Sequence, residues 1–527
     1  MAAERRQVAI VGAGFAGSLL ARILAARGVD VVLLEKGSHP RFALGESSTP
    51  LANLALERLA SRYGFEDLHQ LATHGRWKRC HPELRCGLKR GFTFYHHELD
   101  QPYRPSPASR MLVAANPRAS VADTHWLRAD VDHHFVRQAV AAGADYRDRV
   151  TLREARSEPD GVRLVGARDG EALEIRARFV VDASGPAGFL AREIPIPSAL
   201  RRLRTRSALL FGHFRGVREL AHVVDAPFVP GPYPDEWAAV HHLFAGGWCY
   251  SLRFDDGLTS AGALLAPVPR HRAVSALAAR DPETAWASLL LRLPSLALQF
   301  GDAKAVRPVE YRPRVQHRLT RATGQHWAVL PHTFAFVDPL FSTGIAWSLI
   351  GVERLAGLFE EGPRSHPSGA RLRAYDRLLN AEADQIDRLI AGAYSALGRF
   401  RLFAAQAQLY FAAVSWAEIR QRLGLTADPA WSGFLGADDA VLRGAVAESL
   451  RRVRRAAAAR GADREGAAAG FEAWVRETIE PRNLAGLADP ARGNLYPIDN
   501  LELIDRHELL GLDRDELDRL LPRIDGR

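Results

Sequence analysis

The sequence predicts an α/β fold with a mainly helical C-terminal region, and three observations support this fold class. Residues 7–11 and 29–34 are short apolar runs typical of buried strands, and residues 18–26 between them have helical character. Strand-like and helix-like segments then mix to about residue 350. Beyond residue 351, long segments rich in Ala, Leu and Arg have helical spacing. A chain of 527 residues is too long for one typical core, so we expect two or three packed subdomains.

The turn after the first strand carries the pattern G-x-G-x-x-G. Gly12 permits the tight turn, Gly14 lets a pyrophosphate approach the backbone, and Gly17 lets the helix pack on the strand. The helix that follows offers free N–H groups to phosphates. Glu35, at the end of the second strand, is placed to accept hydrogen bonds from an adenosine ribose. Together these features predict a dinucleotide-binding βαβ unit.

Composition narrows the class of protein further. The chain is 47% hydrophobic and 25% charged, as soluble globular proteins are. It has no run of about 18 apolar residues, so we expect no integral membrane segment. Its three cysteines are few and lack metal-ligand spacing, so we expect a cytoplasmic protein without a metal site. The net charge of +9 is spread along the chain, which suits an anionic cofactor and does not favour nucleic acid.

Histidine pairs and a long apolar segment are the remaining candidates for a metal site or a substrate site. The pairs lie at residues 96–97, 133–134 and 241–242. Adjacent side chains in a strand point to opposite faces, so such a pair does not readily share a metal ion. No G-x-S-x-G pattern supports hydrolase chemistry. Residues 402–416 are apolar and aromatic at helical spacing, which indicates a core helix or, second, the lining of a substrate tunnel or a dimer contact.

Four further motifs follow the βαβ unit along the chain. They are Gly45-Glu46-Ser47-Ser48-Thr49-Pro50, Arg128-Ala129-Asp130-Val131-Asp132, Val181-Asp182-Ala183-Ser184-Gly185 and Asp338-Pro339-Leu340-Phe341-Ser342-Thr343-Gly344-Ile345. In this order and spacing they resemble the flavin-dependent halogenases, which belong to the wider FAD monooxygenase fold. The resemblance extends from the N-terminus to roughly residue 420. The resemblance implies an FAD-binding Rossmann-like domain of the glutathione-reductase/monooxygenase type in residues 1–360. A substrate-binding β-sheet would be inserted at about 70–115 and 200–305, and residues 361–527 would be mainly helical.

The resemblance also implies which residues bind the cofactor and a halide. Glu46 and Ser47 would lie near the isoalloxazine ring, Arg128 near the flavin, and Asp182 and Gly185 on the adenine side. The implied FAD-binding residues are Gly12, Gly14, Ala16, Gly17, Glu35, Glu46, Ser47, Arg128, Asp182, Gly185, Asp338 and Ile345. The backbone N–H groups of Thr343 and Gly344 would bind chloride or bromide, since successive N–H groups form an anion site without a charged side chain.

The resemblance assigns catalysis to Lys89, which begins the matching segment Lys89-Arg90-Gly91-Phe92-Thr93-Phe94. In the family, reduced flavin, oxygen and halide give hypohalous acid, and a lysine positions or captures it for attack by an electron-rich carbon. A compact amine suits this step, and arginine does not. Burial would lower the pKa of the lysine. Only four of the 70 basic residues are lysines, so a lysine here supports a specific role. His96 and His97 would lie near it and contact substrate.

Three departures from the family pattern qualify the expected reaction. The usual W-x-W-x-I-P segment reads Trp248-Cys249-Tyr250-Ser251-Leu252-Arg253. The usual Gly-Asp pair before Asp338 reads Pro331-His332, so His332 would take over the hydrogen bond to the ribityl chain. Tryptophan halogenases have a glutamate where this chain has Phe341. The last departure favours a phenol- or pyrrole-type substrate over free tryptophan.

These observations predict a halogenase-like FAD oxidoreductase acting on an electron-rich aromatic or pyrrole-type substrate. The substrate would be free or tethered to a carrier protein. No second G-x-G-x-x-G is present, so a partner flavin reductase would supply the reduced cofactor. The altered segment at 248–253 keeps a second hypothesis open, namely a monooxygenase (hydroxylase) or a geranylgeranyl-reductase-like enzyme of the same fold. A third is a non-catalytic FAD-binding carrier.

Overall fold

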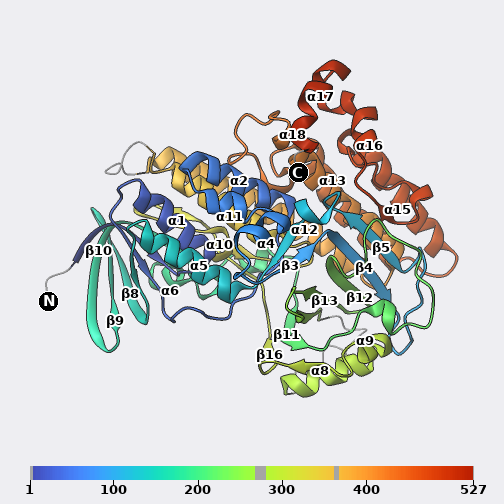
Figure 1. Ribbon diagram of the computed structural model, residues 1–527, viewed down its shortest axis with the longest axis horizontal. Helices are drawn as coiled ribbons and strands as arrows, with labels where there is room; N and C mark the ends of the chain where they lie inside the picture. The colour runs from blue at the N-terminus through green and yellow to red at the C-terminus, as the bar shows by residue number, and fades with distance from the viewer. Residues whose placement is uncertain (1–3, 268–280, 361–366, 526–527) are drawn as a thin grey trace.

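Two large β-sheets lie side by side in the molecule, and helices pack around them (Figure 1). The computed structural model describes residues 4–267, 281–360 and 367–525. One sheet has eight strands and the other has nine. The predicted α/β fold with a helical C-terminal region is confirmed. Residue 361, where the helical region is predicted to begin, lies outside the described residues.

The first sheet contains the strand that leads into the glycine turn. Its parallel strands are ordered β7, β2, β1, β10 and β19, and the register places Val8 between Val31 and Phe179. All four residues of β2 are buried, as the continuous apolar runs of a covered parallel strand require. The strands are β1 (Glu4–Val11), β2 (Val31–Leu34), β7 (Asp145–Arg147), β8 (Val150–Glu158), β9 (Gly161–Arg168), β10 (Glu171–Asp182), β18 (Thr323–Gly324) and β19 (Trp327–Val329).

The second sheet combines distant stretches of the chain. Its central strands β12 and β4 are parallel, with His241 opposite Phe94. Its strands are β4 (Gly91–His97), β5 (Arg110–Ala114), β11 (Ala208–Arg215), β12 (Ala239–Phe244), β13 (Gly247–Arg253), β14 (Leu258–Leu265), β15 (Lys304–Ala305), β16 (Glu310–Arg312) and β21 (Leu495–Tyr496). Most of these strands fall within the two predicted insertions, and we propose the domain division on that basis. A separate short ladder pairs β3 (Cys86–Lys89) with β6 (Asp123–Trp126).

Four long helices form most of the C-terminal region. They are α12 (Gly369–Ala396), α13 (Phe400–Arg422), α14 (Ala440–Ala458) and α15 (Asp463–Ile479). Helix α13 is buried along most of its length, which agrees with its prediction as a core helix. Strand β21 pairs with β5, so the C-terminal segment joins the second sheet. Within the described ranges, no helix is long and apolar enough to cross a membrane.

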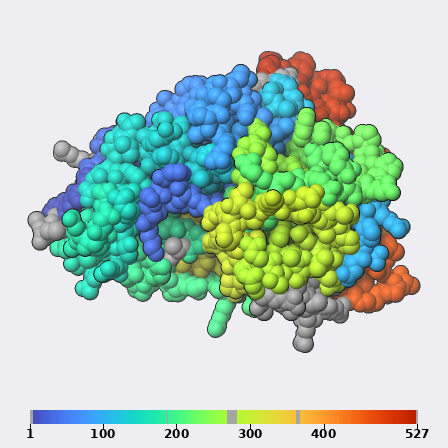
Figure 2. All heavy atoms as spheres, turned by 60° about the horizontal axis from the view of Figure 1, so that its bottom comes forward, coloured from blue at the N-terminus to red at the C-terminus, as the bar shows by residue number. Residues whose placement is uncertain are grey.

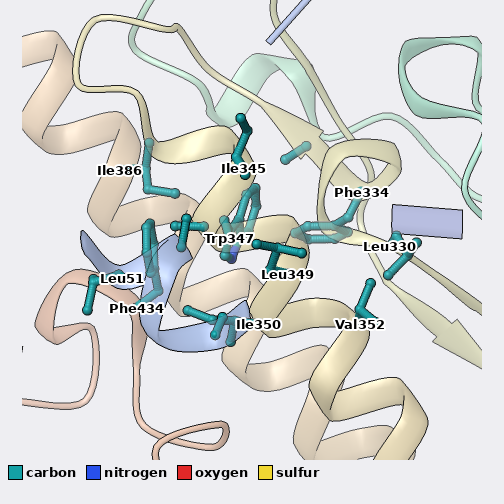
Figure 3. Packing of buried hydrophobic residues seen from close by; sticks show 14 of the residues in the cluster. Leu51, Leu330, Phe334, Ile345, Trp347, Leu349, Ile350, Val352, Ile386 and Phe434 are labelled. Atoms are coloured by element: carbon teal, nitrogen blue, oxygen red, sulfur yellow. The ribbon is translucent and has the colours of Figure 1, made fainter. Parts of the chain in front are cut away.

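Helix α11 (Thr343–Gly357) is held rigidly between its neighbours. Figure 3 shows Ile345, Trp347 and Ile350 in a buried cluster with Leu51 of α2 (Pro50–Tyr63) and Ile386 of α12. A polar clamp runs through this apolar packing. The Trp347 indole and the Arg354 guanidinium both donate to the Glu382 carboxylate, at 2.7 and 2.9 Å for one oxygen. The N-terminal turn of α11 therefore has a fixed position.

Candidate functional site

A cavity of about 870 Å³ lies where the glycine turn, the segment after β2 and the start of α11 meet. Its volume falls in the range of small-molecule and cofactor sites. Figure 2 shows the surface hollowed between a dark-blue N-terminal segment and a yellow-green segment near residue 300. Of the predicted site residues, those that line it are Gly12, Gly14, Ala16, Gly17, Glu35, Glu46, Ser47, Arg128, Gly185, Gly344 and Ile345. We refer to it as the main cavity.

The glycine turn is shaped by close backbone contacts. Gly12 has φ +105°, and a Cβ there would lie 2.5 Å from the Ala183 carbonyl oxygen. A Cβ on Gly17 would overlap the carbonyl oxygen of Gly12. Gly14 immediately precedes α1 (Phe15–Ala26), and a Cβ there would meet its nearest atom only at 3.6 Å. The turn thus exposes a helix N-terminus to the main cavity, an arrangement that binds phosphate.

Glu35 connects the glycine turn to the segment after β2. Its carboxylate accepts from the backbone N–H groups of Ala13 at 2.9 Å and Gly37 at 3.0 Å. Arg41 donates to the same carboxylate at 3.1 Å. Burial raises the pKa of Glu35, but Arg41 and the two N–H groups outweigh it, so the net pKa is lowered. Glu35 is therefore an ionised hydrogen-bond acceptor at the edge of the cavity.

Arg128 fixes the loop that carries Glu46 and Ser47. It begins α5 (Arg128–Ala141), pairs with Asp132 at 2.8 and 2.9 Å, and donates to the Leu44 carbonyl at 2.6 Å. The same Asp132 accepts from the backbone N–H of Phe15, at 3.2 Å. Helices α1 and α5 and the loop before Glu46 are therefore joined by one buried ion pair.

Glu46 and Ser47 each have a partner from a distant strand or helix. The Glu46 carboxylate lies 3.0 Å from Nε2 of His213 on β11, and both side chains are buried. The Ser47 and Ser342 hydroxyls lie 3.1 Å apart. This second contact connects the Glu46 segment to the turn before α11. His213 was not expected from the sequence, because an isolated histidine in a strand gives no signal of its partner.

The turn before α11 has an unusual backbone. Ser342 adopts φ +51° although it is not glycine, and it lines the main cavity together with Gly344 and Ile345. A Cβ on Gly344 would lie 2.6 Å from Nε2 of His332, so a side chain there would displace the imidazole. Thr343 does not line the cavity. The first N–H groups of α11 are the donors that this turn presents.

Two predicted cofactor residues, Asp182 and Asp338, lie behind the cavity wall. Asp182 accepts from the backbone N–H groups of Ser184 and Leu190, at 2.9 and 2.7 Å. Asp338 accepts from Ser207 at 3.1 Å and from Tyr394 at 2.6 Å. Burial raises the pKa of Asp338 to about 7. Both carboxylates therefore hold the turns that line the cavity and do not line it themselves.

His332, which the sequence predicts as a ribityl contact, lines the main cavity. Burial lowers its pKa to about 3, and Arg128 adds to that effect, so the ring is neutral. Its Nε2 is buried without a hydrogen-bond partner among the described residues. A neutral imidazole nitrogen in this position is a donor or acceptor for a ligand hydroxyl.

Alternate residues of the altered motif on β13 face the main cavity. Trp248, Tyr250 and Leu252 line it, as the period of a strand requires. Arg253 points elsewhere and donates to Glu236 at 2.9 Å. The Trp248 indole donates to the Tyr394 hydroxyl at 3.1 Å, and Tyr394 donates onward to Asp338. Hydrogen bonds through Tyr394 thus connect the cavity-wall residue Trp248 to Asp338.

Lys89 lies outside the main cavity and is fully buried at the end of β3. Its Nζ donates to the Ser48 carbonyl at 2.5 Å and lies 4.1 Å from the centre of the Phe92 ring. Asp123 is its cross-strand partner on β6 and is also fully buried. Burial lowers the pKa of Lys89 to about 7, although the Asp123 charge opposes the shift. The amine is therefore available without protonation near neutral pH.

Aromatic side chains connect the main cavity to Lys89. His241 lines the main cavity, and its ring stacks on Trp248 at 5.2 Å and on Phe94 at 4.8 Å. It also stacks on Phe92, the ring that faces Lys89, at 5.8 Å between centroids. Burial lowers the pKa of His241 to about 3, so it is neutral. Nothing in the sequence signals this role, because His241 appears there only as one of three histidine pairs.

A second, smaller cavity of about 80 Å³ lies beyond Phe92. Helix α13, the end of β5 and the C-terminal segment form its walls. Its lining residues are Pro50, Phe92, Val113, Ala114, Ala115, Tyr410, Phe411, Val414, Ser415, Glu418, Ile419, Leu484, Ala485, Leu487, Tyr496, Pro497, Ile498, Asp499, Asn500 and Leu503. The second interpretation of residues 402–416, the lining of a substrate tunnel or a dimer contact, stays a prediction, and Tyr410, Phe411, Val414 and Ser415 of this segment line the cavity.

The other histidine pairs lie away from both cavities. His96 and His97 line neither, and Nε2 of His97 lies 3.0 Å from Nδ1 of His242, so neither cavity supports the expected substrate contact near Lys89. The pair at 133–134 lies on helix α5, not on a strand. Elsewhere, His74, Cys86 and Asp255 bring donor atoms within 4.8 Å of one another. Lys78 already lies 2.9 Å from that Asp255 carboxylate, and it neutralises the charge a metal ion would need.

Comparisons with protein families match both parts of the chain. A model described as FAD dependent oxidoreductase matches residues 7–133. A model described as Tryptophan halogenase matches residues 123–401, just over half of the chain. Residues on both sides of the main cavity and Asp123 therefore lie within matched regions, whereas the C-terminal wall of the second cavity lies outside them.

Comparisons with individual proteins point to the same group. The chain is 28% identical over 411 residues to monodechloroaminopyrrolnitrin halogenase PrnC of Pseudomonas fluorescens, covering 76% of this chain and 70% of that protein. It is 28% identical over 400 residues to tetracycline 7-halogenase of Kitasatospora aureofaciens, covering 75% and 71%. The fold is similar to that of halogenase PltM, solved with phloroglucinol and FAD. That comparison has a TM-score of 0.83 at 23% identity and covers 93% of this chain and 99% of that one.

Proposed function

Because the chain belongs to the tryptophan halogenase family of flavin-dependent enzymes, we propose that it places a halogen, as an electrophile, on an electron-rich aromatic or pyrrole-type ring. It is an FAD-dependent oxidoreductase. The observation that carries the proposal is Lys89. Its amine is wholly buried, and it faces an aromatic ring that also contacts a residue of the main cavity.

The donor set of the main cavity fits FAD. The glycine turn and the N-terminus of α1 suit the pyrophosphate, and the ionised Glu35 suits the adenosine ribose. His332 has a buried, unpartnered nitrogen for a ribityl hydroxyl. When bound in its reduced form, FAD supplies, with oxygen, the oxidising power that converts a halide into hypohalous acid. The chain's own residues hold the reactants and exclude water.

The halide site that we propose is the turn before α11. The left-handed Ser342 directs the chain so that the N–H groups of Thr343 and Gly344 begin the helix. Free N–H groups and the positive end of the helix dipole favour a chloride or bromide ion. The hydrogen bond between Ser342 and Ser47 keeps this turn next to Glu46.

Lys89 would then receive hypohalous acid. In its neutral form the amine has a lone pair, so it either accepts a hydrogen bond from the acid or takes its halogen. In the second case the N–halogen bond forms, the O–halogen bond breaks, and the amine proton leaves with the hydroxide as water. The contacting rings of Trp248, His241 and Phe92 would line the route from the main cavity. The ring to be halogenated would occupy the second cavity, with Phe92 between it and the lysine at rest.

The test is halogenation of a panel of phenols, indoles and pyrroles with a flavin reductase, halide and air. We expect Lys89→Ala to lose at least 100-fold in halogenated product, measured by mass spectrometry, while it binds FAD as the wild type does. Lys304→Ala, which alters an exposed lysine, is the matched control and should keep full activity. If Lys89→Ala halogenates as well as the wild type, the assigned role is wrong.

A second candidate function is hydroxylation by the same fold. It is favoured by Tyr250 and Arg253, which stand where the family motif has tryptophan and proline. Incorporation of oxygen-18 from labelled dioxygen into the product, with no response to halide, would select this function over halogenation.

We propose two working partners and a location. A flavin reductase would supply reduced FAD, since the chain has one dinucleotide motif. The substrate would be a small aromatic molecule, either free or tethered to a carrier protein. The cysteines Cys80, Cys86 and Cys249 are free thiols, which suits the reducing cytoplasm.

A further inference from the structure

The second cavity differs from the rest of the molecule in its charge. The chain has 70 basic and 61 acidic residues, yet the 20 described residues that line this cavity include no lysine, arginine or histidine. Two carboxylates, Glu418 and Asp499, are among them. The wall is therefore neutral to negative in a protein that is otherwise basic.

Glu418 is the buried acidic group of this wall. It lies on α13 with 5% of its surface exposed, and Arg422 donates to it from the next turn at 2.8 Å. Arg422 does not line the cavity; it lies behind Glu418, where Glu57 is 3.8 Å away. The guanidinium thus holds in place the carboxylate of Glu418, which lines the cavity.

Aromatic rings form the end of the cavity nearest to Lys89. Phe92 meets Tyr410 and Phe411 edge-on, with centroids 6.0 and 5.5 Å apart. The Tyr410 hydroxyl donates to the carbonyl of Phe341 at 2.8 Å, so it is already engaged outside the cavity. Such a wall favours a flat aromatic ligand through ring–ring contacts.

These walls disfavour a ligand that carries a negative charge. A ligand carboxylate would lie near the buried Glu418 with no lining cation to pair with, and burying an unpaired charge is costly. An N–H or ammonium group, in contrast, would find an acceptor in Glu418. Charge-assisted hydrogen bonds of this kind are stronger than neutral ones.

We infer that the second cavity binds an aromatic ring that bears an amine or N–H donor and no carboxylate, with Glu418 as the acceptor. The inference rests on the proposed function in one respect, namely that this ring is the halogen acceptor. It narrows the substrate class, because aromatic acids and amino acids with a free carboxylate would be excluded.

The test measures binding by isothermal titration calorimetry on the FAD-loaded, oxidised protein without halide. Three indoles that differ only at position 3 are compared: tryptamine, 3-methylindole and indole-3-acetate. We expect tryptamine to bind at least ten-fold more tightly than indole-3-acetate, with 3-methylindole between them. Equal binding of tryptamine and indole-3-acetate, or no binding of any of the three, would overturn the inference.

Two variants assign the preference to a residue. Glu418→Gln keeps the shape of the side chain and should reduce the ratio of tryptamine to indole-3-acetate affinity at least three-fold. Glu57→Gln is the matched control, because Glu57 also approaches Arg422 but does not line the cavity. It should leave the ratio unchanged, and a Glu418→Gln protein with the wild-type ratio would refute the role of Glu418.

The outcome is separable from the halogenation assay. A protein that prefers tryptamine but halogenates nothing would contradict the proposed function and retain the ligand class. A protein that halogenates and binds all three indoles equally would do the reverse.

Discussion

The main cavity and the second cavity differ in the charge of the side chains that line them. The main cavity is lined by six basic side chains, Lys36, Arg41, Arg128, Arg192, Arg312 and Arg314. The second cavity is lined by carboxylates and, among its described lining residues, by no base. One site therefore suits an anionic dinucleotide and a halide, and the other suits an uncharged or amine-bearing ring. The basic residues are therefore concentrated at the cavity that suits anions, even in a chain that is basic overall.

Lys89 lies between these two regions and lines neither cavity. Among the described lysines, only Lys89 has no exposed surface. Asp123 of β6 pairs with it across the two-stranded ladder of β3 and β6. The protein around the amine shields it from bulk water. Substitutions in each region test this electrostatic difference.

The largest effect is expected on the glycine turn. A Cβ on Gly17 overlaps the Gly12 carbonyl, so Gly17→Ala forces the turn apart and should weaken FAD binding at least 100-fold, measured by flavin fluorescence quenching. Tryptamine binding to the second cavity should persist if the two regions are independent. Gly444→Ala is the control, since no atom lies within 4 Å of its Cβ, and it should leave FAD affinity unchanged.

The next effect concerns the buried Glu46–His213 pair. His213→Leu leaves the Glu46 carboxylate buried without this partner, which should lower the free energy of unfolding by about 3 kcal/mol. Urea denaturation of the FAD-loaded protein measures it. Adding Glu46→Gln removes the charge and should recover part of the loss. A single variant within about 0.5 kcal/mol of the wild type would show that the pair adds little.

The third effect is a shift in pH dependence at Lys89. Below its pKa of about 7 the side chain is an ammonium, and above it the amine is free, so halogenation should rise with pH through this range. Asp123→Asn removes the charge that favours the ammonium form, so the rise should move to lower pH. A shift of about one pH unit corresponds to a ten-fold gain in free amine on the acidic side. Asp100→Asn, at an exposed aspartate paired with Arg292, is the control. An unshifted pH profile in Asp123→Asn would show that Asp123 does not set the pKa of Lys89.

Much of the main cavity could be predicted because its residues form contiguous motifs. The glycine turn, Glu46 and Ser47, and the turn before α11 each lie within a few consecutive residues, and those predicted for the cavity wall largely lie there. Asp182 and Asp338 are exceptions, since a motif reveals that a carboxylate is near a site but not which side of the wall it faces. Family resemblance supplied FAD, which the glycine turn alone leaves open.

The second cavity could not be predicted, because its walls come from segments as far apart in the chain as Pro50 and Leu503. Helical spacing in residues 402–416 predicts an apolar helix, but Glu418 follows that segment and its direction depends on α13 packing. The role of His241 depends on the parallel pairing of β12 with β4, a contact between residues about 150 apart. Long-range pairing of this kind leaves no local pattern.

The smallest effect is expected at the border of the two regions. Tyr394 accepts from Trp248 and donates to Asp338, so Tyr394→Phe removes both hydrogen bonds and should cost about 1 kcal/mol of stability. The Trp248 ring would then be less fixed beside His241, and we expect about two-fold more hypohalous acid to escape per halogenated product, measured with a chlorination trap. Tyr375→Phe is the matched control, because its buried hydroxyl donates to the Val329 carbonyl at 3.0 Å and Tyr375 lines neither cavity. It should show a similar loss of stability with no change in escape. Equal escape in both variants would mean that Trp248 is held by packing alone, and that the two regions communicate through stacked rings and not through the Tyr394 hydrogen bonds.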